Sequence, residues 1–405
     1  MAPQRGERKL AGSERSEPPG RRRTTIRTAA GVAGRPCAPA GAHSFIAIFR
    51  GFAFAHPRLS SQRPSRAQLR TEVLKRMTTE RVLVTGATGF TGGHLCERLA
   101  RDGHSIRAVA RQPDNCSDLR RWGVEVVPGD LRDPASLEKA IQGVDVVYHI
   151  AALFRPENVS RKDMWETNVQ GTRNILDASV KAGVRRFIHC STVGVHGDIK
   201  NPPGNEETPY GPGDYYQESK TEGERVAMQY AADGRLPVVV FRPGGIYGPG
   251  DLRFLKLFKG IKKRGFVMLG SGEVAYQMVY IDDLIDGILR CGTHEKAVGN
   301  VYILTGDTPV TLNRLVEVIA EALSVSAPRL HVPVTPVYVA GFILELLCKP
   351  FGIHPPLYRR RVDFFRKTRS FDISKAKNEL GFRPQTELKT GVTLTAAWYT
   401  KNNLL

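Results

Sequence analysis

Three glycines at intervals of three, Gly86, Gly89 and Gly92, follow a short apolar run and precede a helical pattern. The first glycine permits a tight turn, the second lets backbone approach a pyrophosphate, and the N-terminus of the helix favours negative charge. A structural turn can share this spacing, but a strand before it and a helix after it are what dinucleotide binding requires. We therefore expect a dinucleotide-binding turn formed by Gly86, Thr88, Gly89, Phe90 and Gly92.

The chain from Arg81 to about Arg242 alternates short apolar runs with helical patterns, as parallel βαβ units require. The expected strands are Val82–Thr85, Ile106–Ala110, Val124–Val127, Val144–Ile150, Arg186–Cys190 and Pro237–Phe241. The expected helices include His94–Arg101, Pro134–Ile141, Lys162–Ala182 and Tyr216–Ala232. The sequence thus predicts an α/β fold, a Rossmann-type doubly wound parallel sheet within a domain of residues 77–245.

In residues 246–405 the regular alternation of strand and helix patterns stops. Helical patterns predominate, with occasional short strands such as Phe266–Leu269 and Val301–Leu304. This part is predicted to form a smaller, mainly helical lobe that binds the substrate over the carboxyl edge of the sheet. Within it, Val332–Cys348 is notably apolar but too short to span a bilayer. We expect a buried or interfacial helix there, with peripheral membrane contact through residues 332–348 as an open alternative.

Tyr216 and Lys220 lie four residues apart in a predicted helix, so they share one of its faces. There the Lys220 ammonium can favour the Tyr216 phenolate and bring its pKa from about 10 towards neutral. Thr192 and Ser191 follow a predicted strand, at the edge where open α/β sheets bind ligands. These four residues are the predicted catalytic set, in which a phenol exchanges a proton while a hydride moves.

Most of the formal charge of +19 belongs to the first 76 residues, which hold 16 Lys and Arg against 4 Asp and Glu. The other 329 residues hold 43 against 36. Residues 1–76 are rich in Arg, Pro, Ser and Gly, so we expect a disordered extension and no specific nucleic-acid partner. It can be a transit peptide, a basic arm or sequence upstream of a true start at Met77, the reading we favour.

The six cysteines are scattered without a Cys-x-x-Cys pair, and no His cluster has metal-ligand spacing. This pattern suits a reducing compartment, so we expect a cytoplasmic protein without a metal site.

The choice of cofactor rests on the predicted strand that ends at Ala110. A carboxylate at such an end binds the ribose 2′-hydroxyl of NAD, whereas an Arg accommodates the 2′-phosphate of NADP. Here no carboxylate follows, and Arg111 is placed for a phosphate. Both NAD and NADP stay open, with NADP slightly favoured.

From Met77 to its end, the chain resembles the extended short-chain dehydrogenases/reductases of the NAD-dependent epimerase/dehydratase type. The resemblance rests on seven ordered motifs: Thr85–Gly92, Gly129-Asp130-Leu131, His149–Ala152, Asn168–Thr172, Ser191-Thr192, Tyr216-x-x-x-Lys220 and Arg242–Pro249. It implies that Tyr216 is the acid/base, that Lys220 lowers its pKa and holds the nicotinamide ribose, and that Thr192, rather than Ser191, binds the reacting oxygen. It also implies cofactor contacts from Asp130, Leu131, Ala151, Ala152 and Pro243, and a structural role for Asn168.

Two departures from the family patterns narrow the expected chemistry. Dehydratases carry Asp-Glu where this chain has Val193 and Gly194, so dehydration is disfavoured. Nucleotide-sugar epimerases place a phosphate-binding Arg where this chain has Tyr276, and an Arg is the natural bidentate grip for a phosphate. With the apolar 332–348 stretch, these departures favour an apolar alcohol or ketone, as in the 3β-hydroxysteroid dehydrogenases and dihydroflavonol 4-reductases.

We therefore predict an NAD(P)-dependent oxidoreductase acting on a small molecule. The alternatives are a nucleotide-sugar epimerase with retained NAD and, from another class, a non-catalytic dinucleotide-binding scaffold. The resemblance also implies a homodimer, formed through the helices at Lys162–Ala182 and Tyr216–Ala232.

Overall fold

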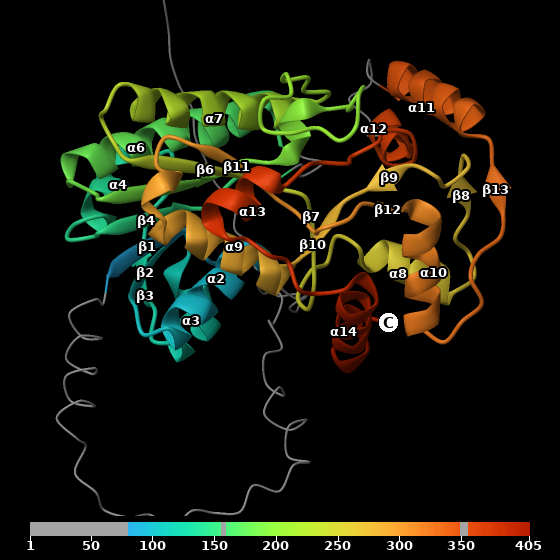
Figure 1. Cartoon of the computed structure of the whole chain (residues 1–405), viewed down its shortest axis with the longest axis horizontal. Helices are drawn as coiled ribbons and strands as arrows, with labels where there is room; N and C mark the ends of the chain where they lie inside the picture. Colours follow the sequence, from blue (N-terminus) through green and yellow to red (C-terminus); the bar gives the residue numbers. More distant parts are fainter. Residues whose placement is uncertain (1–79, 155–158, 349–354) are drawn as a thin grey trace, which may run out of the picture. The chain divides into compact units, whose positions relative to one another are not determined.

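The computed structural model describes residues 80–154, 159–348 and 355–405 (Figure 1). The predicted extension of residues 1–76, and Met77 with it, lies outside this part of the chain.

A seven-stranded sheet forms the centre of the described chain, with every neighbouring pair parallel. Its spatial order is β11-β6-β5-β4-β1-β2-β3, which confirms the predicted doubly wound Rossmann-type sheet. The strands are β1 (Arg81–Thr85), β2 (Ser105–Ala110), β3 (Glu125–Pro128), β4 (Val146–His149), β5 (Arg186–Cys190), β6 (Val238–Pro243) and β11 (Val301–Leu304). The strand order reverses between β1 and β4, which is where such sheets bind ligands.

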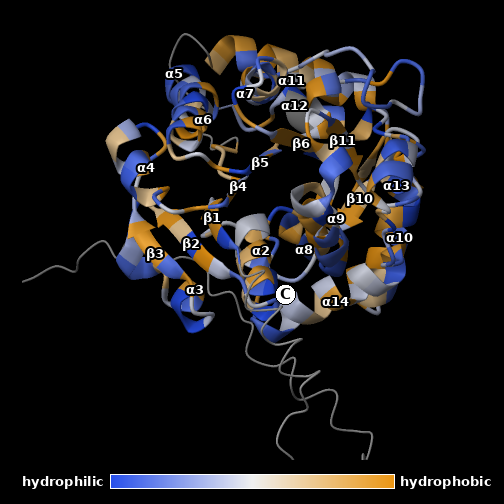
Figure 2. Ribbon diagram, turned by 60° about the vertical axis from the view of Figure 1, so that its left-hand side comes forward, coloured by the Kyte–Doolittle hydropathy of each residue, from blue (hydrophilic) through white to orange (hydrophobic). Residues whose placement is uncertain are grey.

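Side chains alternate between the two faces of the sheet, and each face has its own apolar core. Val82 and Val84 of β1 belong to the core shared with α2 (Phe90–Arg101) and α9 (Ile281–Thr293). Leu83, between them, belongs to the opposite core. Figure 2 shows apolar colour concentrated along the strands and two-toned helices around them.

Three helices, α4 (Pro134–Ala140), α6 (Gly171–Lys181) and α7 (Tyr215–Ala232), line the Leu83 face side by side (Figure 1). Helix α6 is preceded by α5 (Arg161–Trp165) and a π-helical turn at Glu166–Gln170. The single helix predicted at Lys162–Ala182 is therefore interrupted, a feature that often marks functional sites.

One expectation about the C-terminal part is wrong. The strand Val301–Leu304 was expected in the substrate lobe, but as β11 it pairs with β6 and extends the main sheet. Helix α9 likewise packs against β5 and β6. A four-residue apolar run carries no signal of which sheet it will join, and here the exposed edge of β6 accepts it.

The remaining C-terminal elements form short strand pairs and helices beyond the sheet. They are β7 (Gly245–Tyr247), α8 (Leu255–Lys262), β8 (Met268–Leu269), β9 (Ala275–Tyr276), β10 (Met278–Tyr280), β12 (Val310–Thr311), α10 (Leu312–Ala322), β13 (His331–Val332), α11 (Val334–Cys348), α12 (Arg359–Val362), α13 (Ser374–Leu380) and α14 (Leu388–Lys401), with the short helices η4 (Glu295–Ala297) and η6 (Asp363–Phe365). Three further short helices lie between strands of the main sheet: η1 (Pro113–Asn115) and α3 (Ser117–Arg121) between β2 and β3, and η3 (Val193–His196) after β5.

The apolar stretch predicted as a buried or interfacial helix is α11, and it is not buried. Gly341 alone among its fifteen residues is buried. No helix in the described ranges has the length and apolar character to cross a membrane.

Candidate active site

The glycine turn between β1 and α2 has the geometry of a backbone cradle. Gly86 adopts φ +75°, and a Cβ there would lie 2.7 Å from the Ala151 nitrogen. A Cβ on Gly92 would lie 2.2 Å from the Gly86 carbonyl oxygen. Helix α2 starts after Gly89 with no side-chain cap and no acidic residue in its first turn, which leaves its N–H groups for an anion. These residues fit a pyrophosphate.

A buried hydrogen-bond chain ties this turn to the neighbouring strand and the π turn. The Thr172 hydroxyl donates to the Asn168 carbonyl oxygen at 2.7 Å, so it accepts from Nε2 of His149 at 3.1 Å. Nδ1 of His149 then accepts from the Thr85 hydroxyl at 2.8 Å. Burial lowers the pKa of His149 to about 3, which keeps the ring neutral for this arrangement. The cradle therefore rests on a rigid base.

Asn168 connects the same region to α7. Its side chain bonds both backbone groups of Leu153, at 2.7 and 3.1 Å, and donates to the Ser219 hydroxyl at 3.0 Å. These contacts agree with the structural role expected for Asn168.

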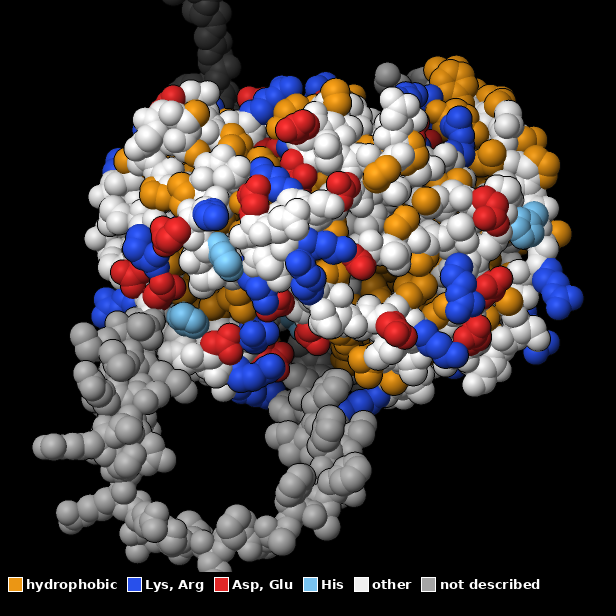
Figure 3. Space-filling view, viewed as in Figure 1, with side chains coloured by type: hydrophobic (Ala, Val, Ile, Leu, Met, Phe, Trp, Pro, Cys, Tyr) orange, Lys and Arg blue, Asp and Glu red, His pale blue; other side chains and the backbone are white. Residues whose placement is uncertain are grey.

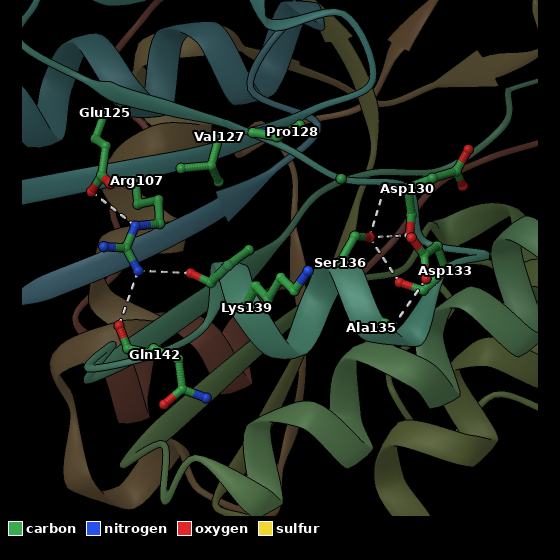
Figure 4. A pocket seen from close by; sticks show the side chains of 12 residues that line it. Arg107, Glu125, Val127, Pro128, Asp130, Asp133, Ala135, Ser136, Lys139 and Gln142 are labelled. Atoms are coloured by element: carbon green, nitrogen blue, oxygen red, sulfur yellow. Dashed lines mark hydrogen bonds and ion pairs between the residues drawn. The ribbon is translucent and has the colours of Figure 1, made fainter.

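Arg111 and Asp130 lie at the same carboxyl edge, on the side of the sheet formed by β2 and β3. Arg111 is exposed just after β2, and Asp130 follows β3. Although partial burial opposes it, hydrogen bonds from Arg132 and the charges of Arg132 and Arg111 lower the pKa of Asp130. Asp130 also lies at one end of a hollow of about 540 Å³ between β3 and α4 (Figure 4). None of the predicted catalytic residues lines this hollow.

Helix α7 carries the candidate proton-transfer residues on one face. Asp214 caps the helix by accepting from the Gln217 backbone N–H at 2.9 Å, which fixes the first turn around Tyr216. The Tyr216 ring packs edge-on against Phe154, with centroids 5.0 Å apart. One turn on, Lys220 is 3% exposed, and its Nζ donates to the Cys190 carbonyl oxygen at the end of β5 at 2.5 Å.

The charge of Lys220 acts in a dry environment. Burial lowers the pKa of its ammonium, while Cys190 and the Glu224 carboxylate partly offset the shift. An ammonium without solvent screening has a stronger field on nearby groups.

The two hydroxyl residues after β5 have different surroundings. Ser191 is buried and its hydroxyl donates to the Glu224 carboxylate. Thr192 is only partly buried; its Oγ1 accepts from the Gly194 N–H at 3.0 Å, so its own proton stays available to donate. This contrast supports Thr192 over Ser191 for binding a reacting oxygen.

A buried ion pair behind Ser191 was not predicted. Glu224 is fully buried and accepts from Nε of Arg242 at 3.1 Å and from the Tyr210 hydroxyl at 2.8 Å. Arg242 also donates to Nε2 of His196 at 3.0 Å. The sequence did contain one signal for the position of Glu224. It follows Lys220 by four residues, so the two side chains share a face of α7.

Arg253 lies beside the cradle. Its guanidinium sits 5.5 Å from the Phe90 ring centre and 6.0 Å from that of Phe154, and Nε donates to Asp251 at 2.6 Å.

The predicted site residues occupy the carboxyl ends of adjacent strands in the sheet. In spatial order they are Pro243 (β6), Ser191 and Thr192 (after β5), Ala151 and Ala152 (after β4), Gly86 (after β1), Arg111 (after β2), and Asp130 and Leu131 (after β3). Lys220 joins this row through its contact with Cys190, and Tyr216 lies one turn before it on α7. A ligand that bridges all of them must be long and extended, as a dinucleotide is.

Comparison with known proteins gives the family and the fold. The sequence profile of the NAD dependent epimerase/dehydratase family matches residues 82–304. The chain is 30% identical to 3beta-hydroxysteroid-dehydrogenase/decarboxylase isoform 1 of Arabidopsis thaliana, covering 80% of each chain. It is also 30% identical to the 3 beta-hydroxysteroid dehydrogenase/Delta 5-->4-isomerase of Mycobacterium tuberculosis, over 80% of this chain and 92% of that one. Among solved structures, the dTDP-glucose 4,6-dehydratase DesIV of Streptomyces venezuelae, with NAD bound, is 26% identical with a TM-score of 0.65, over 80% of this chain and 98% of that one.

Proposed function

Because the chain belongs to the NAD-dependent epimerase/dehydratase family, we propose that it is an NAD(P)-dependent oxidoreductase acting on a secondary alcohol or ketone. The observation that carries this proposal is the face of α7 that presents Tyr216 and Lys220, with Lys220 anchored to the end of β5 next to Thr192. This set of groups suits proton transfer to or from a carbonyl or alcohol oxygen.

The bound nicotinamide would supply or accept the hydride. Tyr216 would exchange a proton with the substrate oxygen, while the Thr192 hydroxyl donates a hydrogen bond to that oxygen and orients it. Lys220 would favour the phenolate by its charge and hold the nicotinamide ribose. The glycine cradle, with Thr88 and Phe90, would grip the pyrophosphate, and Asp130, Leu131, Ala151, Ala152 and Pro243 would line the rest of the cofactor.

For the substrate we propose an apolar, steroid-, isoprenoid- or flavonoid-like compound. Two relatives named as 3β-hydroxysteroid dehydrogenases support this class. The position expected to carry an Arg in nucleotide-sugar epimerases holds Tyr276, whose ring packs against Phe364 with centroids 5.2 Å apart. Val193 and Gly194 replace the acidic pair expected of dehydratases, which disfavours elimination of water.

One observation favours a second candidate, a nucleotide-sugar epimerase. Arg369 places its guanidinium 5.6 Å from the centre of the Tyr276 ring, and its backbone N–H donates to Ala275 at 2.8 Å. A cation therefore lies next to the position where the sequence pattern lacks one, and it is able to bind a substrate pyrophosphate.

A turnover assay separates the candidates. The purified full-length chain is given NAD or NADP with a panel of steroids, flavonoids and nucleotide sugars, and nicotinamide absorbance is followed. Net cofactor turnover with an apolar alcohol or ketone is the expected result. Conversion of a nucleotide sugar without net turnover, abolished by Arg369→Gln, would establish the epimerase instead.

A further inference from the structure

Helix α11 exposes a continuous apolar stripe. Val339, Phe342, Ile343, Leu346 and Leu347 are 47–60% exposed, although they are large hydrophobic residues. Their spacing of three, four, seven and eight residues places them on one face of the helix. Figure 3 shows apolar side chains gathered where α11 lies in Figure 1, at the upper right. Such a stripe needs an apolar medium or an apolar partner.

The sequence segment that contains this helix accounts for most of the net positive charge of residues 77–405. Residues 329–369 hold 8 Lys and Arg against 2 Asp and Glu, an excess of 6. The whole of residues 77–405 has an excess of only 7, from 43 against 36. A basic surround on an apolar helix favours an anionic surface.

The only acidic residue of α11 is neutralised by this basic surround. Glu345 accepts from Nε of Arg359 at 2.9 Å, and the Arg359 guanidinium also lies 4.7 Å from the centre of the Phe342 ring. Arg366 lies 4.1 Å from the centre of the Tyr338 ring. Arginines stacked on aromatic rings beside an apolar face can keep their stems in an apolar layer and their charges at its polar boundary.

The segment after α12 connects this helix to the rim of the candidate active site. Phe364, next to Asp363 of η6, packs against Tyr276, and a Cβ on Gly245 would lie 2.7 Å from the Tyr276 ring. Nearby, a Cβ on Gly213 would lie 3.3 Å from Nζ of Lys367. Gly213 comes three residues before Tyr216.

From these contacts we propose that α11 docks the protein on an anionic lipid surface, with its apolar stripe in the boundary layer and Arg359 and Arg366 at the headgroups. A second copy of the chain fits this face less well. A twofold contact would place two segments with an excess of six positive charges against each other, which is repulsive. An anionic lipid surface would bury the apolar stripe and also attract the positive charge.

Docking of this kind would bring the rim of the active site to the surface where apolar substrates partition. This consequence rests on the proposed function, whereas lipid binding itself does not. Vesicle binding is measured without substrate, so its failure would leave the proposed redox activity untouched.

The test is co-sedimentation of the full-length chain with vesicles of phosphatidylcholine, with and without phosphatidylserine. We expect binding to the mixed vesicles, and loss of at least about tenfold in affinity for the double variant Ile343→Glu with Leu347→Glu. Both side chains are about half exposed or more, so the fold should survive. The matched control is Val298→Glu, at an apolar position that is 37% exposed and lies between η4 and β11.

A second readout reports on depth. The indole added by Leu346→Trp should be quenched by phosphatidylcholine brominated on its acyl chains. The basic extension of residues 1–76 is the same in every variant, so differences between variants report on α11. Equal binding of parent and double variant, or an unquenched added indole, would overturn the proposal. So would light scattering that shows the parent as an oligomer which the double variant dissociates, because a second copy would then cover the stripe.

Discussion

At the residue scale, two adjacent tyrosines at the start of α7 differ in their surroundings. Tyr215 is 55% exposed, with the Arg161 guanidinium 4.3 Å from its ring centre. Tyr216 is partly buried against Phe154, on the face that carries Lys220 one turn further on. Only Tyr216 therefore has the position expected of an acid/base.

Tyr216→Phe should lower kcat by about 10²- to 10⁴-fold, the usual contribution of general acid–base catalysis, because it removes the exchangeable proton but keeps the ring. Cofactor affinity and melting temperature should stay close to those of the parent. Steady-state kinetics on the substrate found in the turnover panel measure the loss. Tyr215→Phe is the control and should keep near-normal activity; the reverse pattern would show that the assignment of Tyr216 is wrong.

The two hydroxyl residues after β5 should separate catalysis from stability. Thr192→Ala is expected to lower kcat by about 10²-fold with little change in stability, since it removes a positioned hydrogen-bond donor. Ser191→Ala should instead lower the free energy of unfolding by about 1–3 kcal/mol, because Glu224 loses a partner in a buried site. Urea unfolding and kinetics on both variants give the comparison, and equal kinetic effects would contradict it.

The residue-scale predictions from sequence rest on short-range geometry. The four-residue spacing sufficed to predict that Tyr216 and Lys220 share a face of α7. That the Ser191 hydroxyl donates to Glu224 could not be predicted in this way, because Glu224 lies 33 residues away in the sequence. Glu224 is in turn bound by Arg242, which is more distant still. Interactions between distant residues follow from the fold and have no local signal.

At the element scale, the start of α2 depends on two backbones in close approach. Gly92→Ala would place a Cβ 2.2 Å from the Gly86 carbonyl oxygen, so the turn or the helix must shift. We expect a loss of about 1–3 kcal/mol in stability, and weaker cofactor binding because the cradle opens. Fluorescence titration with NAD and NADP, with thermal melting, measures both effects.

The next residue provides the control for this variant. A Cβ on Gly93 would have its nearest neighbour, the Ala87 carbonyl oxygen, at 3.5 Å, which is ordinary contact. Gly93→Ala should therefore be close to neutral. If Gly92→Ala binds cofactor as the parent does, the cradle is not a cofactor site.

Helices and strands were predicted correctly from sequence where the hydrophobic periodicity was strong. The prediction failed where the packing partner of an element determines its place in the fold. The strands from β1 to β6 lie within a few residues of their predicted bounds. In contrast, the sheet that Val301–Leu304 joins and the exposure of α11 depend on which surfaces remain after the rest has packed. The apolar content of α11 predicted a helix, but composition alone does not say which medium it faces.

At the scale of the whole molecule, the proposed row of cofactor-binding residues along the sheet edge predicts that stability depends on the cofactor. A ligand that binds only the folded state stabilises it by about 2.7 kcal/mol at about 100 times its Kd. Either cofactor should therefore raise the melting temperature, and the one that fits the end of β2 should raise it further at equal concentration.

Arg111→Asp tests which cofactor that is. The exposed guanidinium of Arg111 at the end of β2 would pair with the 2′-phosphate of NADP, whereas a carboxylate there would repel that phosphate and accept from the ribose hydroxyls of NAD. We expect NADP to raise the melting temperature of the parent more than NAD does, and the order to reverse in the variant. Arg120→Asp makes the same charge change at an exposed position on α3 and should leave the order unchanged. Parallel shifts for both cofactors in parent and variant would remove Arg111 from the cofactor site, and the preference for NADP would lose its basis.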